Sequence, residues 1–76
     1  MKIVREEASG DLYIDQDCQY NELNADKVVV APYVTARLYG TIKQSITIKK
    51  GSSVNLHGKV LGTVINEGGV LKLYEA

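Results

Sequence analysis

Apolar residues alternate with single outward positions along most of the chain after residue 27. The apolar pairs are Val28 and Val30, Ala36 and Leu38, Ile46 and Ile48, and Val54 and Leu56. A period of two is the pattern of a β-strand with one buried face. The stripe at positions i, i+3, i+4 and i+7 that an amphipathic helix needs does not appear after residue 10. The pattern therefore predicts an all-β chain.

A short motif returns at nearly equal intervals. Residues 37–40 read Arg-Leu-Tyr-Gly, residues 55–58 read Asn-Leu-His-Gly and residues 72–75 read Lys-Leu-Tyr-Glu, so the second interval is shorter than the first by a single position. Neighbouring positions recur in the same register, with Ile42 matching Val60. A fixed period of this kind is the signature of a repeat architecture. The shortening falls at residues 66–69, where two glycines predict a turn.

Glycines separate the apolar pairs, and glycine turns a corner at the least steric cost. We expect three short strands and three corners in each repeat, which describes a short parallel β-helix of about three to four coils. Residues 1–76 form a single domain, in which residues 28–76 are the repeated coils. The acidic residues 1–27 form a degenerate first coil, placed by Leu12-Tyr13-Ile14, or a cap. A small antiparallel β-sandwich or barrel is the alternative, because regularly spaced glycine turns occur there too.

In a parallel β-helix each residue lies over its equivalent one coil earlier, about 4.8 Å away. The repeat therefore predicts columns of like side chains. Two columns point inward, Leu38 with Leu56 and Leu73, and Ala36 with Val54 and Leu71; a third points outward as a stack of rings, Tyr39 with His57 and Tyr74. In the first coil the inward candidates are Cys18, Tyr20 and Leu23. Strict alignment also places Asn66 inward, where its amide would cost about 1–3 kcal/mol unless it caps a backbone group.

Charge is unevenly distributed although it sums to zero. Residues 1–26 hold seven acidic and two basic side chains, whereas residues 27–66 hold six basic and no acidic ones. We interpret this as an acidic segment packed beside a basic one within the molecule, with an anion-binding face as the alternative. Zero net charge argues against nucleic acid as a partner.

Residues 56–69 carry leucine, glycine, valine and glycine at alternate positions, as Leu-x-Gly-x-Val-x-Gly. In this pattern the chain resembles bactofilins, bacterial cytoskeletal proteins that polymerise without nucleotide, and the resemblance covers residues 28–74. It implies a right-handed, three-faced β-helix that assembles end to end and has no catalytic residues. The chain departs from the family in having few coils and no long proline-rich flanking tails.

No group of residues matches a catalytic, metal or cofactor motif. His57 is the only imidazole and no acidic residue lies near it in sequence, so a stacking role is favoured over general base catalysis. Cys18 stands beside Asp15 and Asp17, whose negative charge raises the pKa of the thiol and disfavours a reactive thiolate. The sequence predicts a protein that is not an enzyme and that binds neither a cofactor nor a metal.

These observations favour a structural or assembly module that associates with itself, for example as a dimer, or docks to a protein partner. A chain of 76 residues buries a small core and its one cysteine makes no internal disulfide, so association is the remaining way to gain stability. We expect the assembly interface at Leu71, Leu73 and Tyr74 of the last coil, with no following segment to cover them. The acidic N-terminal end is expected to act as a cap.

The alternative function is a small regulatory module that binds a ligand or a protein through an exposed face. Its contacts are expected at Tyr39, His57, Lys49 and Lys50, where rings and positive charges reach the surface. The N-terminus turns charged after two apolar residues, unlike a secretory signal, and no apolar run is long enough for a transmembrane segment. With a single thiol as well, these features predict a cytoplasmic location.

Overall fold

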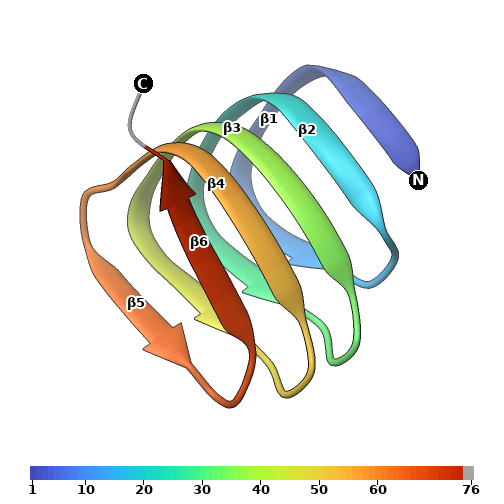
Figure 1. The fold of residues 1–76 in the computed structure, drawn as a ribbon. Coiled ribbons are helices and arrows are strands. Elements are labelled where there is room, and N and C mark those ends of the chain that lie inside the picture. The colour runs from blue at the N-terminus through green and yellow to red at the C-terminus, as the bar shows by residue number, and fades with distance from the viewer. Residues whose placement is uncertain (75–76) are drawn as a thin grey trace.

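Every strand pairing in the described part of the structure is parallel. The computed structural model describes residues 1–74, and Figure 1 shows its strands following one another in stacked coils. The chain makes about four turns, which is the architecture of a β-solenoid, or parallel β-helix. The strands are β1 (Lys2–Ile14), β2 (Cys18–Val30), β3 (Thr35–Ile48), β4 (Ser53–Val60), β5 (Thr63–Asn66) and β6 (Val70–Tyr74). The predicted all-β parallel fold is confirmed, and the antiparallel alternative is wrong.

The register of the last coils follows the sequence repeat. Leu38 of β3 pairs with Leu56 of β4, and Leu56 pairs with Leu73 of β6. Strand β5 pairs with β3 at the same interval as β4 does, beginning with Ser45 opposite Thr63. The shortening of the repeat therefore falls between β5 and β6, in the glycine turn where the sequence placed it. Glu75, which ends the last copy of the motif, lies outside the described residues.

The acidic N-terminal segment, predicted as a first coil or cap, forms the first coil and also the beginning of the second, which starts with β2 at Cys18. Strand β1 pairs with β2 along its length, and Leu12 and Ile14 lie beside Val28 and Val30 as predicted. The register shifts along this pair. The number of residues that separates two partners is therefore larger at the end of β1 than at Glu7, which pairs with Glu22. These shifts, together with a coil that is shorter than the next, explain why the repeat is faint in this part of the sequence.

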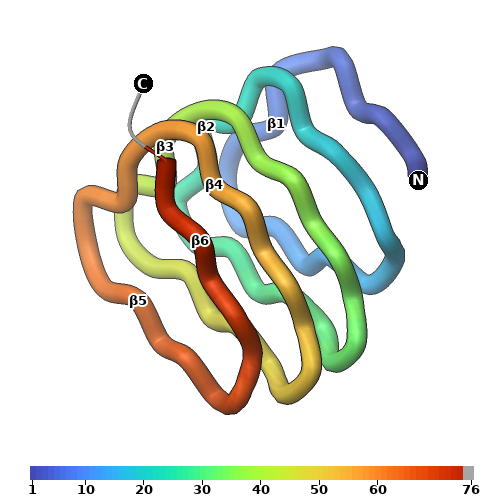
Figure 2. The backbone as a smooth tube through the Cα atoms, in the orientation of Figure 1, coloured from blue at the N-terminus to red at the C-terminus, as the bar shows by residue number. Residues whose placement is uncertain are grey.

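The first three coils contain longer strands than the sequence predicts. Each of β1, β2 and β3 is one strand of 13 or 14 residues, so the prediction of three short strands in each coil is wrong here. In Figure 2 the backbone bends within these strands and continues beside its neighbour. The bend keeps its hydrogen-bond ladder because register shifts and glycines absorb the change of direction.

Gly40 and Gly58 form one such corner in neighbouring coils. Their φ angles are +142° and +150°, values that residues with a side chain rarely adopt. A β-carbon on Gly58 would overlap the carbonyl oxygen of Gly40, and one on Gly40 would overlap that of Leu23. The backbones therefore approach too closely at this corner for any residue except glycine.

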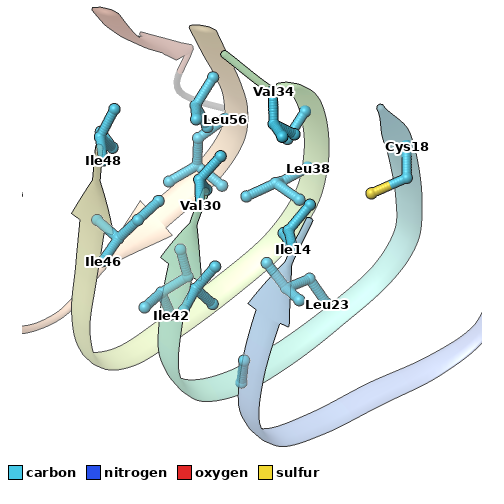
Figure 3. Close-up of a cluster of buried hydrophobic side chains, with 14 of the residues drawn as sticks. Ile14, Cys18, Leu23, Val30, Val34, Leu38, Ile42, Ile46, Ile48 and Leu56 are labelled. Atoms are coloured by element: carbon cyan, nitrogen blue, oxygen red, sulfur yellow. The ribbon is translucent and has the colours of Figure 1, made fainter. Parts of the chain in front are cut away.

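The core consists of the inward columns that the repeat predicts. Leu38 and Leu56 are fully buried, as are their neighbours Ile46 and Ile48. Figure 3 shows these side chains pointing into the space that the coils enclose. In the first two coils Cys18 and Leu23 are buried and Tyr20 is half-buried against the same core, which confirms the inward candidates.

Asn66 keeps the register position that the alignment gives it, opposite Ile48, but it is exposed. Its Oδ1 accepts hydrogen bonds from the backbone N–H groups of Gly68 and Gly69, both at 2.9 Å. Its amide therefore caps a backbone group, as the sequence analysis allowed, and the capped group is the turn between β5 and β6.

Within residues 1–74 there is no helix with the length and apolar character needed to cross a lipid bilayer.

We expect Leu56→Ala to lower the free energy of unfolding by about 2–5 kcal/mol, because the cavity would lie in the middle of a buried column. Urea denaturation measures this loss. A loss below about 1 kcal/mol would contradict the column assignment, since that is the cost of a site that relaxes or is exposed.

Candidate interaction surfaces

Three aromatic rings form a ladder on the outside of the coils. The ring centroids of Tyr39 and His57 are 4.6 Å apart with planes 11° from parallel, and those of His57 and Tyr74 are 4.6 Å apart at 12°. The strands set this geometry, because the three residues occupy paired outward positions on β3, β4 and β6. The predicted outward stack is therefore confirmed.

A groove runs across the coils beside this ladder. It has a volume of about 1000 Å³ and extends from Glu7 in the first coil to Leu73 in β6. Gly40 and Gly58 line it, and they are preceded by Tyr39 and His57 and followed by Thr41 and Lys59. We call this feature the axial groove. It is hollow at the glycine corner because that corner carries no side chains.

The axial groove brings together opposite charges from distant parts of the chain. Glu7 and Glu22 are register partners on β1 and β2, and both are exposed. Lys59 lies two coils further along, on β4. Sequence reasoning missed the two glutamates, because the register shift between Tyr20 and Leu23 moves this part of β2 out of the simple repeat.

The structure separates the predicted partner contacts into two places. Tyr39 and His57 meet in the ladder and line the axial groove. Lys49 and Lys50 lie instead at the turn that follows β3. The ammonium of Lys49 forms an ion pair with Glu67 at 3.1 Å, while Lys50 is exposed.

The neighbouring turn, between β2 and β3, carries an aromatic residue that the sequence reasoning did not select. Tyr33 is 74% exposed and has a φ of +61°, which is uncommon for a bulky residue. Its ring lies over Gly51, where a β-carbon would overlap it, and its N–H donates to the carbonyl of Lys50 at 3.2 Å. The preceding Pro32 was the available signal for a turn here.

The inward columns end at an exposed surface beyond β5 and β6. Leu73 continues the column of Leu38 and Leu56 but is 52% exposed, and Val64 continues the column of Ile46 but is 45% exposed. Leu71 is half-buried, and Tyr74 is 44% exposed. The three predicted interface residues thus lie together on the last strand. We call this surface, formed by the outer edges of β5 and β6, the C-terminal end.

The N-terminal end differs in its burial. The inward residues of β1, among them Leu12, are half-buried, and Ile14 is 2% exposed. The adjoining turn is acidic: Asp15 and Asp17 are exposed, and Asp17 accepts a hydrogen bond from the N–H of Thr35 at 2.9 Å. The acidic first coil thus packs directly on the second and leaves fewer apolar side chains open than the C-terminal end does.

Within residues 1–74 no cluster of histidine, cysteine or acidic side chains has a geometry that would hold a metal ion. Comparisons of the chain with protein-family models, with curated proteins and with solved structures gave no match. The resemblance to bactofilins therefore rests on the sequence pattern of residues 56–69 alone.

Cys18 is buried at an inward position beside Ala36. Burial raises the pKa of its thiol above the ordinary value, and the negative charge of Asp17 raises it further. The predicted direction of the shift is correct, although burial rather than charge is its main cause. The thiolate is disfavoured at neutral pH.

We expect His57→Tyr to leave the free energy of unfolding nearly unchanged. Tyrosine already occupies both equivalent positions, and the substitution keeps a flat ring at the same spacing. Thermal unfolding followed by circular dichroism measures the effect. A large drop in melting temperature would instead reveal a contact that only the imidazole makes.

We expect stability to fall as the pH rises above about 8, and to fall less in Cys18→Ala. The unfolded thiol loses its proton near pH 8.5, before the buried one does, so rising pH favours the unfolded state. Urea denaturation of both proteins at each pH measures the difference. Identical pH dependence in the two proteins would contradict the assignment to Cys18.

Proposed function

We propose that this protein is a structural module that associates with itself, and that two copies join through their C-terminal ends in a closed two-fold dimer. The cytoplasm is the proposed location, since a single buried free thiol suits a reducing compartment. The resemblance of residues 56–69 to bactofilins supports end-to-end association.

The observation that carries this proposal is the exposure of core columns at the C-terminal end. Leu73 and Val64 occupy inward positions, yet about half of each side chain is open to solvent. Strands β5 and β6 also present a free edge, because over residues 1–74 each is paired on one side only. Exposed apolar side chains beside an unpaired strand edge favour pairing with another chain.

The shape of this end suits a second copy. Five strand segments are stacked on the face that ends with β6, from β1 through β2, β3 and β4. Four are stacked on the face that ends with β5, because β5 pairs directly with β3. The face that ends with β6 therefore holds one more strand segment than the face that ends with β5, and the C-terminal end is a step.

A step of this kind is self-complementary under a two-fold axis perpendicular to the stack. Each β6 would lie on the β5 of the other copy, antiparallel to it, and both free edges would gain a partner. Head-to-tail stacking fits less well, since a first coil placed on β6 would leave β5 uncovered. The exposed acids Asp15 and Asp17 beside the N-terminal end also disfavour contact between two N-terminal ends.

We expect Leu73→Lys to convert the dimer to monomers, because it would place a charge on each side of a buried contact. Light scattering after size exclusion, across a range of protein concentrations, measures the mass. Val64→Lys tests the same surface from β5, and because Val64 is already 45% exposed, this variant is expected to fold even if Leu73→Lys does not.

The control is the double variant Glu6→Ala with Glu7→Ala, in the first coil, which should leave the dimer intact. Circular dichroism establishes that each variant is folded. A wild-type protein that stays monomeric at high concentration would overturn the proposal. The proposal would also be overturned if Leu73→Lys and Val64→Lys both fold and still form dimers.

A further inference from the structure

We propose that the axial groove binds a proline-rich peptide segment in the polyproline II conformation, with a basic residue at the end that meets Glu7 and Glu22. This site runs along the side of the stack and meets the surface proposed for self-association only at Leu73.

The spacing of the aromatic ladder matches the repeat of such a peptide. Two steps of 4.6 Å separate the ring of Tyr39 from that of Tyr74. Tyr39 and His57 line the groove, and Tyr74 continues their stack outside the lining. A polyproline II helix rises about 3.1 Å per residue with three residues per turn, so one turn advances about 9.3 Å, nearly the length of two steps. A peptide lying along the stack would therefore present the same face to every second coil.

The groove offers the contacts that proline-rich peptides use. Such peptides dock in grooves lined by aromatic side chains, and their carbonyl groups accept hydrogen bonds because proline has no N–H to donate. Here the Tyr39 hydroxyl and the Lys59 ammonium are donors in the lining, and Leu23 and Val60 supply apolar surface. The glycine corner leaves room for bulky pyrrolidine rings to approach the backbone.

The groove is also partly organised before binding. The two rings that line it, Tyr39 and His57, are stacked on each other and lie on paired strands, and Tyr74 continues the stack outside the lining. Side chains that are already ordered lose little entropy when a ligand binds. The polyproline II helix likewise forms without a partner, so both sides start close to their bound conformations.

Charge sets the direction of the peptide. Glu7 and Glu22 are neighbours in register on β1 and β2, so their like charges repel each other until a cation lies between them. Lys59, on β4, stands further along the groove, two coils from Glu22. A complementary peptide carries an arginine or lysine where it meets Glu7 and Glu22. It carries carbonyl groups or an acidic residue where it meets Lys59.

The test is a titration of the full chain with a fluorescein-labelled synthetic peptide of two arginines followed by about six prolines, since about six residues at 3.1 Å span four strand spacings of about 4.8 Å. The control peptide replaces the prolines with alternating glycine and serine. Fluorescence anisotropy should show saturable binding of the proline peptide and at least tenfold weaker binding of the control. Equal binding of both peptides, or binding of neither, would overturn the proposal.

Variants locate the site. Tyr39→Ala and Glu22→Lys should each weaken binding by about tenfold or more, the effect typical of an important interface residue. Asp11→Lys makes the same charge reversal as Glu22→Lys at an exposed position outside the groove, and it should change binding less than about twofold.

Thr41→Trp would fill the groove while leaving the ladder in place. This variant tests the site if circular dichroism shows that Tyr39→Ala does not fold. It should also weaken binding about tenfold. Equal losses in Asp11→Lys and Glu22→Lys would show that only net charge matters and would overturn the site. Full binding by a folded Thr41→Trp variant would do the same.

Discussion

The parallel, in-register stacking of coils is the constraint on which the rest of this structure depends. Each residue pairs with its equivalent one coil away, so the side chain at one position decides what its neighbours can be. Inward positions must be apolar, because a polar group there would have no partner; Leu38, Leu56 and Leu73 satisfy this requirement. Corner positions where backbones nearly touch must be glycine, as Gly40 and Gly58 are.

The same constraint creates the surfaces that we propose to be functional. Pairing in register turns three outward rings into a ladder with a fixed spacing of 4.6 Å, and it turns the glycine corner into the floor of a groove. The stacking also leaves the last coil incomplete, since its inward side chains would be buried only if another strand layer packed on them. Leu73 and Val64 show this most clearly, because both occupy core positions without being buried.

The two proposals use different parts of the molecule and can hold together. Self-association would cover the edges of β5 and β6, whereas peptide binding would use the side of the stack along Tyr39 and His57. They meet at Leu73, which lines the groove and also lies on the proposed dimer surface. A dimer would then carry two grooves whose C-terminal ends approach the same interface.

The sequence by itself determined the repeat and, through it, the residues of the inward columns and of the aromatic ladder, because these depend only on the spacing between equivalent residues. It favoured the parallel coil, and the strand pairings of the structure then excluded the antiparallel alternative. Tertiary structure alone decided which residues share the axial groove. Glu7 and Glu22 reach it through register shifts that no repeat length reveals. It also decided the place of Asn66, which occupies a core register position but caps an exposed turn, because no strand among residues 1–74 covers β5 on that side. Spacing is a local property of the chain, whereas burial depends on which strand lies next to each residue.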